Sequence, residues 1–351
     1  MREKVIALTV SLIIFVVVLI IGVSVATRSS EREKSAKKPE VKTVQAVPAA
    51  EVQEQLPPPP PPPPVKKYRF KRTDRLNSRM PFDYSTARRL PKELAQYRYT
   101  AGILVDLENR KVLWQQNSKN PVPIASLTKL LTLYTAFEEL EKREDIDLKT
   151  RVTVSLESAA ADKVKMNLKP GEKVPLHTLF IYAMLRSAND AAHLIAEYFG
   201  NGENSVFVRK MNRNAYLAGM TDFKFYNANG LPIYGKTPQE PTLMNTASCL
   251  DMVRLIDRVY DYPAILSYTS MQEANTPHGI IRNGNRLLGS FRGMEGLKTG
   301  YTNAAGHCLA FSCQRNGKRL VGVVTGFAKR QNCFDFTAKL LDWGFRVNSV
   351  K

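Results

Sequence analysis

The architecture of this chain is best read from the segment Pro123-Ile124-Ala125-Ser126-Leu127-Thr128-Lys129-Leu130-Leu131-Thr132-Leu133, where a Ser-x-x-Lys tetrad meets the start of an apolar run. The apolar residues recur at helical spacing, which predicts a helix with one face toward a core. They are Leu127, Leu130, Leu131, Tyr134 and Phe137. Ser126 and Lys129 share one face of that helix, about one turn apart. Because serine is a weak nucleophile until a neighbouring base activates it, Lys129 is a candidate base.

The tetrad alone favours an ordinary amphipathic helix start as much as it favours catalysis, since both residues are common. A second copy, Ser35-Ala36-Lys37-Lys38, lies in a charged stretch without an apolar face. Two further short motifs change the balance. Ser187-Ala188-Asn189 ends an apolar run, and Lys298-Thr299-Gly300 lies in a strand-like segment. The order, spacing and context of the three motifs together indicate an active site.

With these motifs the chain resembles the penicillin-binding serine D,D-peptidases, and in particular the low-molecular-weight D-alanyl-D-alanine carboxypeptidases. The resemblance covers about residues 99–345 and includes Asn227–Pro232 and Leu341–Phe345. It implies a β-lactamase/D,D-peptidase-like fold. It also implies an acyl-enzyme on Ser126 that releases the terminal D-alanine of a peptidoglycan pentapeptide, and acylation of the same serine by penicillins and other β-lactams.

Strand and helix signals independently predict an α+β fold. A hairpin is expected from 101–106 and 111–114, followed by a mostly helical middle from 126 to about 268. Strands are expected at 296–301, 307–314 and 319–326, with Asn316-Gly317 as a tight turn, and a last helix at 334–343. Strands at both ends of the chain imply one antiparallel sheet flanked by helices, with a helical lobe inserted in the middle.

The N-terminal third has a different composition. Residues 5–26 are almost wholly apolar and long enough to cross a bilayer, so 1–27 is expected to be a transmembrane anchor. A cleavable export signal ending near Ser24-Val25-Ala26 is the alternative. In both cases the catalytic part is exported, to the periplasm or cell-wall space, and it is secreted if the segment is cleaved. A C-terminal anchor and a second domain, which many relatives carry, are not expected.

Residues 28–65 are expected to be a disordered linker that includes eight consecutive prolines, Pro57–Pro64. Residues 66–98 are a basic, mostly irregular arm, and 99–345 form the catalytic domain. The formal net charge is +19, from 51 Lys and Arg against 32 Asp and Glu. An exported chain does not meet nucleic acid, so the charge indicates attraction to envelope polymers or lipid headgroups, or merely a solvated arm.

The candidate catalytic residues are Ser126, Lys129, Ser187, Asn189 and Lys298. Lys129 is useful as a base near neutral pH only if its pKa falls by about 3 units, and burial beside Lys298 acts in that direction. The resemblance implies that Ser187 passes a proton to the leaving nitrogen and that Asn189 holds a substrate amide.

The candidate substrate-binding residues are Thr299, Gly300, Tyr301 and Arg330. The oxyanion hole is expected from the backbone N–H groups of Ser126 and Tyr301, with Gly300 allowing a close approach. By resemblance, Thr299 and an arginine bind the substrate carboxylate. Arg330 is the nearest arginine in sequence, and a surface charge is its alternative interpretation.

The same residues are compatible with other functions. A D,D-endopeptidase acting on crosslinks has the same motifs, a serine β-lactamase shares the tetrad, and an inactive cell-wall-binding protein is the alternative from another class. The histidines at 177, 193, 278 and 307 have no paired spacing for a metal, so no metal and no cofactor are expected, and His307 is expected to be a packed core residue. The four cysteines are expected to be buried without an essential disulfide.

Overall fold

The computed structural model describes residues 80–237 and 239–349. The chain divides into two units, 1–64 and 65–351, and all described residues belong to the second. The expected anchor, the linker and residues 66–79 of the basic arm therefore lie outside the described residues. Within the described residues, no helix combines the length and apolar character needed to cross a membrane.

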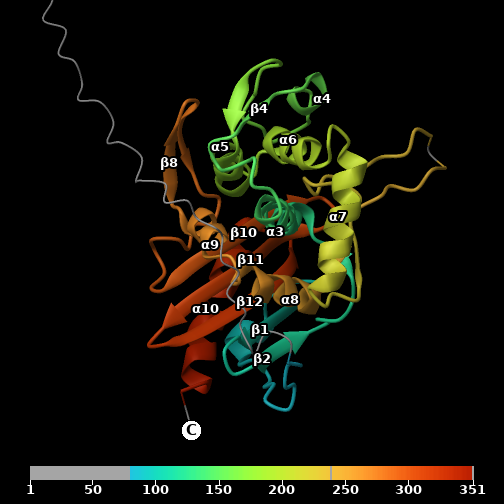
Figure 1. Ribbon diagram of the computed structural model, residues 1–351. Coiled ribbons are helices and arrows are strands. Elements are labelled where there is room, and N and C mark those ends of the chain that lie inside the picture. Colours follow the sequence, from blue (N-terminus) through green and yellow to red (C-terminus); the bar gives the residue numbers. More distant parts are fainter. Residues whose placement is uncertain (1–79, 238, 350–351) are drawn as a thin grey trace, which may run out of the picture. The chain divides into compact units, whose positions relative to one another are not determined.

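One five-stranded antiparallel sheet organises the described fold, with strand order β10-β11-β12-β1-β2 (Figure 1). Its strands are β1 (Ala101–Asp106), β2 (Lys111–Gln116), β10 (Met294–Thr302), β11 (Gly306–Arg315) and β12 (Lys318–Phe327). The predicted hairpin and the three predicted C-terminal strands are confirmed. Asn316 and Gly317 join β11 to β12 with φ values of +49° and +75°, as a two-residue turn of type I′ requires.

Helices cover both faces of the sheet, so the alternate side chains of its central strands are buried on both sides. Leu104 and Leu320 pack with α10 (Arg330–Val347) in one apolar cluster, and Ile103 and Val321 pack with α8 (Cys249–Val259) in the other. The short helix α2 (Lys92–Ala95) contributes Leu94 to the α10 side. Helix α10 begins four residues before the predicted 334–343 and ends four residues after it. The four cysteines are buried and free, as expected.

The two edge strands of the sheet, β2 and β10, have different neighbours. Residues 83–88 run along β2 and form backbone hydrogen bonds with it, such as Val112 N to Asp83 O at 2.9 Å and Arg88 N to Leu113 O at 2.9 Å. This part of the basic arm is irregular but packed. It provides hydrogen-bond partners for backbone groups of the edge strand β2 that would otherwise be unpaired. The opposite edge strand, β10, faces the single-turn helix η1 (Ala125–Leu127).

The helical lobe is built around α3 (Thr128–Glu141), whose residues are nearly all buried (Figure 1). All five apolar residues of the predicted stripe are buried. The other helices of this part are α4 (Leu156–Ala159), α5 (Leu176–Ile181), η2 (Tyr182–Arg186), α6 (Asn189–Phe199), α7 (Asn204–Leu217) and α9 (Pro263–Ser270).

Short strands interrupt the middle of the chain, which was expected to be mostly helical. They are β3 (Val122–Pro123), β4 (Arg151–Thr153), β5 (Lys173–Pro175), β6 (Phe223–Lys224) and β7 (Thr246–Ala247), with the hairpin β8 (Glu273–Thr276) and β9 (Gly279–Arg282) after α9. Each is two to four residues long, too short to give a clear alternating pattern in the sequence.

Candidate active site

Ser126 lies in η1, immediately before α3. The residue before it, Ala125, has a left-handed backbone with φ +48°, which is uncommon for a residue with a side chain. Thr128 Oγ1 donates a hydrogen bond to Ala125 O at 2.7 Å and holds this conformation. Gly230 packs against the same carbonyl so closely that a Cβ there would lie 2.1 Å from it. The nucleophile segment is therefore fixed from two sides.

Lys129 is 1% exposed, and its Nζ lies among three oxygen atoms. Nζ donates to Ser126 Oγ at 3.0 Å, Asn189 Oδ1 at 2.8 Å and Asn229 O at 2.7 Å. A neutral amine has only two N–H bonds and one lone pair. When the amide and backbone oxygens accept those two N–H groups, the lone pair faces the Ser126 hydroxyl.

The electrostatic surroundings favour that neutral form. Burial is the largest cause that lowers the pKa of Lys129 well below its ordinary value, and the charge of Lys298 is the next. The carboxylate of Asp190 acts in the opposite direction. Burial also lowers the pKa of Lys298 to about 7. Both amines are therefore less basic than exposed lysines, because an ammonium ion is poorly solvated in a buried site.

Ser187 and Asn189 stand at the junction of η2 and α6. Ser187 has a left-handed backbone, with φ +63° and ψ +31°. Among the described residues, no hydrogen bond joins its hydroxyl to Ser126 or Lys129. Asn189 is 2% exposed, and its Nδ2 donates to Asp162 O at 2.9 Å. Asn189 thus already uses both ends of its amide, with Oδ1 on Lys129.

Strand β10 brings Lys298, Gly300 and Tyr301 to the nucleophile segment. A Cβ at Gly300 would lie 3.2 Å from Ser126 N, so glycine lets the strand approach the backbone of the serine. Lys298 is 1% exposed, and its Nζ donates to Thr299 O at 3.1 Å. The structure therefore brings the first and third motifs into contact, as an oxyanion hole made of Ser126 N and Tyr301 N requires.

Arg330 is the first residue of α10, and its Nη2 donates to Gly284 O at 2.7 Å. Gly284 also adjoins Thr299, since a Cβ on this glycine would lie 3.0 Å from Thr299 Oγ1. Arg330 therefore lies on the Thr299 side of the site. Burial, and then the positive charge of Arg286, lower the pKa of Arg330.

His307 differs from expectation. It is only partly buried, and its ring stacks on that of Tyr301 with centroids 4.3 Å apart. The antiparallel register places His307 directly opposite Tyr301 near the ends of β11 and β10, beyond the packed centre of the sheet. An apolar neighbourhood in the sequence was therefore misleading, because it belonged to the strand interior.

Two groups that shape the site are not part of any of the predicted motif roles. One is the backbone carbonyl of Asn229, whose available signal was the Asn-Gly pair that marks a tight turn. The other is Asp190, which is fully buried and accepts from Met166 N and Leu168 N at 2.9 and 3.2 Å. Asp190 ties residues 166–168 to the start of α6, and the neighbouring Asn189 holds Asp162.

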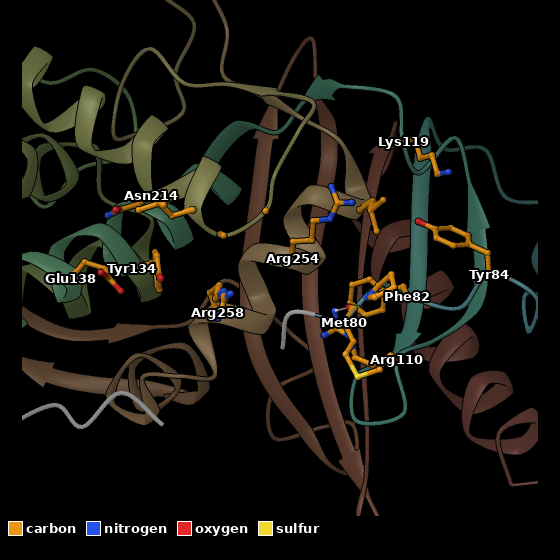
Figure 2. A pocket seen from close by; sticks show the side chains of 15 residues that line it. Met80, Phe82, Tyr84, Arg110, Lys119, Tyr134, Glu138, Asn214, Arg254 and Arg258 are labelled. Atoms are coloured by element: carbon orange, nitrogen blue, oxygen red, sulfur yellow. Dashed lines mark hydrogen bonds between the residues drawn. The ribbon is translucent and has the colours of Figure 1, made fainter. Parts of the chain in front are cut away.

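A cavity of about 780 Å³ lies elsewhere, between residues 80–84, α7 and α8 (Figure 2). None of the candidate site residues lines it. Its three arginines pair with aspartates, and Lys119 and Glu138 add one charge of each sign, so the cavity has no excess charge for an anionic ligand. The pairs are Arg110–Asp257, Arg254–Asp251 and Arg258–Asp261.

Comparison with known proteins decides the family. The model of the D-alanyl-D-alanine carboxypeptidase family matches residues 87–329. The chain belongs to this family. It is 30% identical over 258 residues to D-alanyl-D-alanine carboxypeptidase DacF of Bacillus subtilis (strain 168), and 32% identical over 257 residues to DacC of Escherichia coli (strain K12). These matches cover 72% and 70% of this chain but 63% and 61% of the relatives, so the chain spans less than two thirds of their length.

Other proteins similar to this chain are not named carboxypeptidases. A D-alanyl-D-alanine endopeptidase of Pseudomonas aeruginosa is 28% identical over 263 residues, which cover 72% of this chain and 78% of that protein. Among solved structures, the ampicillin-bound penicillin-binding protein D2 of Listeria monocytogenes has 28% identity and a TM-score of 0.62, covering 70% of this chain and 97% of that one. The described fold, mixed helix and antiparallel sheet, is that of these D,D-peptidases.

Proposed function

We propose that this protein is a serine-type D-alanyl-D-alanine carboxypeptidase that removes the terminal D-alanine from peptidoglycan stem peptides. The observation that carries the proposal is the buried amine of Lys129, which lies 3.0 Å from Ser126 Oγ with two carbonyl oxygens to accept its N–H groups. Membership of the D-alanyl-D-alanine carboxypeptidase family supports the substrate class.

In the acylation step, the lone pair of Lys129 takes the proton of the Ser126 hydroxyl. Oγ then forms a bond to the carbonyl carbon between the two D-alanines. The oxyanion accepts hydrogen bonds from Ser126 N and Tyr301 N, which stabilises charge as it develops. The C–N bond breaks, and the proton held by Lys129 passes through the Ser187 hydroxyl to the leaving amine, which restores the neutral lysine. Water then hydrolyses the ester and restores the serine.

The remaining candidates orient groups or bind substrate. Asn189 orients the Lys129 amine through Oδ1. Its Nδ2 has two N–H groups, of which one donates to Asp162 O and the second is the donor for a carbonyl oxygen of the substrate. Lys298 keeps Lys129 neutral by charge repulsion. Thr299 and Arg330 bind the terminal carboxylate. Both side chains lie near Gly284, which supports this pairing.

β-Lactams would acylate the same serine, because their strained amide meets the same nucleophile and oxyanion hole. The named precedent is the ampicillin-bound structure of the Listeria monocytogenes protein. The test uses the purified full chain with a fluorescent penicillin and, in parallel, D-alanine release from a synthetic pentapeptide. Both signals are expected, and both should disappear in Ser126→Ala. Labelling that persists in this variant would refute the nucleophile assignment.

A D,D-endopeptidase is the second candidate, since 78% of the Pseudomonas aeruginosa endopeptidase is covered by the match. Both activities use the same chemistry, and they differ in whether the substrate ends at the leaving D-alanine or continues into a crosslink. Penicillin labelling without D-alanine release, together with cleavage of crosslinked muropeptides, would favour the endopeptidase.

We also propose that residues 1–27 anchor the chain in the cell membrane, that residues 28–65 are a linker, and that the catalytic domain lies outside the cytoplasm. The length and apolar character of residues 5–26 support the anchor. Protease treatment of intact spheroplasts tests this arrangement. The catalytic domain should be degraded without lysis, and the protein should remain in the membrane fraction after an alkaline wash.

A further inference from the structure

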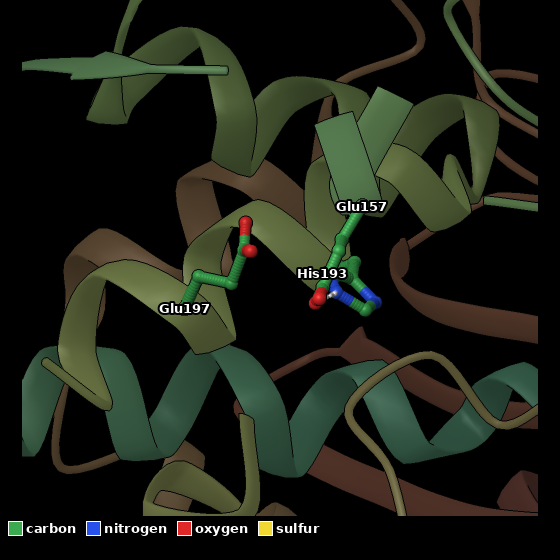
Figure 3. A group of neighbouring side chains, drawn as sticks. All are labelled: Glu157, His193 and Glu197. Atoms are coloured by element: carbon green, nitrogen blue, oxygen red, sulfur yellow. Dashed lines mark ion pairs between the residues drawn. The ribbon is translucent and has the colours of Figure 1, made fainter. Parts of the chain in front are cut away.

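Away from the candidate active site, the helical lobe brings three potential metal ligands together: Glu157 of α4, and His193 and Glu197 of α6 (Figure 3). One ligand atom from each lies within 4.8 Å of the other two. His193 and Glu197 are four residues apart, so they project from one face of α6. Among residues 80–237 and 239–349, this is the one group of three or more His, Cys, Asp or Glu side chains close enough to share an ion.

Among the three ligands, Glu197 has the carboxylate that a nearby cation would stabilise most, because it is the most buried. The residue is 9% exposed, and no Lys or Arg pairs with it in the described part of the chain. Both carboxylate oxygens depend on the single hydroxyl of Ser155, at 2.9 and 2.7 Å. A carboxylate offers about four acceptor sites, and burying it without a cation is costly. A metal ion beside it would offset that cost.

His193 is held in the form that binds metals. Asn204 Nδ2 lies 2.8 Å from its Nε2, and an amide N–H in that position requires a lone pair on this nitrogen. A ring nitrogen that carries a lone pair is the atom through which histidine binds a metal. The same Nε2 lies 3.9 Å from Glu157 Oε2. A metal ion would therefore replace the amide of Asn204 as the partner of a nitrogen that already points toward a carboxylate.

We propose that Glu157, His193 and Glu197 bind one divalent transition-metal ion of the Zn²⁺ class, with water as the fourth ligand. One imidazole and two carboxylates form a ligand set that suits such ions. Metal–ligand distances of about 2.0–2.2 Å require the ligand atoms to approach to roughly 3.4 Å. The side chain of Glu157 is 80% exposed, so it has the freedom to close this gap.

The position of the site determines its effect. His193 lies one turn after Asn189 on α6, and Glu157 lies on α4, just before the segment 162–168 that Asn189 and Asp190 hold. An ion shared by α4 and α6 would hold the start of this segment against α6. Asp190 already holds the end of the segment against the same helix. The ion takes no part in the chemistry of Ser126; it stabilises the wall of the site behind Lys129.

The test is a calorimetric titration of Zn²⁺ into the tag-free full chain after treatment with a chelator. We expect one Zn²⁺ per chain and a higher Tm in its presence. His193→Ala and Glu157→Gln should each weaken binding by at least about 10-fold, the lower bound for lost outer-shell partners of metal sites. The side chain of Glu157 is 80% exposed, so Glu157→Gln removes no buried packing. That of His193 is 26% exposed, so His193→Ala also removes packing and Glu157→Gln is the decisive variant.

The chain offers a matched control. His278 Nε2 lies 3.4 Å from Glu172 Oε1, a His–Glu pair that has no third ligand. His278→Ala should bind Zn²⁺ as the unmodified chain does. The absorption spectrum of the Co²⁺-loaded protein gives a second readout, which should show four-coordinate Co²⁺ in the unmodified chain and lose it in His193→Ala.

Two outcomes would overturn the proposal: the unmodified chain fails to bind Zn²⁺ at micromolar concentration, or His193→Ala and Glu157→Gln bind as tightly as it does. Penicillin labelling is measured on the same samples. Metal binding is measured by calorimetry, Tm and absorption, whereas the enzyme activity is measured by penicillin labelling. A protein that fails to bind metal is therefore distinguished from one that lacks the proposed activity.

Discussion

Lys129 and Lys298 are each 1% exposed, and the charge of Lys298 is, after burial, the second cause that lowers the pKa of Lys129. The two amines reach the same region from different elements, one from α3 and the other from β10. Each would be better solvated at the surface. Burying two cations in one site is therefore costly, and the gain is an amine that is neutral near physiological pH.

The first prediction concerns the pH dependence of acylation in Lys298→Gln. Removing the neighbouring positive charge raises the pKa of Lys129, so the rise of the acylation rate with pH should move to higher pH by roughly one unit or more. The second-order rate of penicillin labelling between about pH 5 and 10 measures it. Lys169→Gln, at an exposed lysine, is the control and should keep the original midpoint. An unchanged midpoint in Lys298→Gln would refute the coupling.

The second prediction concerns stability. The pKa of Lys298 falls from 10.5 to about 7 on folding. Between these two values the unfolded chain binds more protons than the folded one, so the contribution of Lys298 to the free energy of unfolding rises with pH. Below pH 7 the folded protein bears the full cost of a buried ammonium ion, on the order of 5 kcal/mol, and above 10.5 it bears none.

Urea unfolding at several pH values measures this effect. The free energy of unfolding of the unmodified chain minus that of Lys298→Met should rise from pH 7 to 10. Taking the difference cancels the titration of groups that do not interact with Lys298. Lys129 does interact with it, and its contribution to the difference also rises with pH. The same difference for Lys169→Met should be flat, and a flat or falling difference for Lys298→Met would contradict the prediction.

The third prediction concerns Gly300→Ala. The added Cβ would lie 3.0 Å from Ile124 O and 3.2 Å from Ser126 N, so the strand or the nucleophile segment must shift. Displacing one oxyanion donor typically costs about 10²–10³ in rate, and penicillin acylation should slow by that factor while substrate binding changes little. Gly317→Ala is the control: with φ +75° and no atom within 4 Å, it should lower stability without changing the rate.

Local contacts could be predicted from the sequence, and contacts between distant segments could not. Ser126 and Lys129 lie within one helical turn, so spacing alone placed them together. The hairpins joined by short turns were predicted for the same reason. The pairing of β1 with β12, where Ala101 lies opposite Thr325, joins segments more than two hundred residues apart. Only the general expectation of a single sheet anticipated it.

The missed parts of the site follow the same rule. Asn229 contributes a backbone carbonyl, which has no residue preference that a sequence could display. The proposed metal ligands His193 and Glu197 are four residues apart on α6, but the spacing considered was that between histidines, and Glu157 comes from a separate element. His307 was assigned to the core because strand alternation does not reveal where a sheet face ceases to be covered.

The fourth prediction concerns Asp190→Asn. Oδ2 of this carboxylate accepts hydrogen bonds from Met166 N and Leu168 N, and Oδ1 accepts one from Ala191 N at 2.9 Å. An amide keeps only one of these two acceptor oxygens. A buried donor left without a partner costs about 1–3 kcal/mol, so the free energy of unfolding should fall by that amount. Acylation should also slow, because the segment next to Asn189 loses its anchor. Asp145→Asn, at an exposed carboxylate, should leave the urea midpoint unchanged.

The fifth prediction concerns Arg330→Gln and decides between carboxylate binding and a surface charge. A charge-assisted hydrogen bond contributes about 1.5–3 kcal/mol, so kcat/KM for a pentapeptide with a free carboxylate should fall about 10- to 150-fold. A peptide that ends in a C-terminal amide lacks the charge, and its slower cleavage should change little. Arg286→Gln, at an exposed arginine, should alter kcat/KM by less than about 5-fold. Equal losses in both variants, or equal losses on both peptides, would mean that the terminal carboxylate is bound elsewhere.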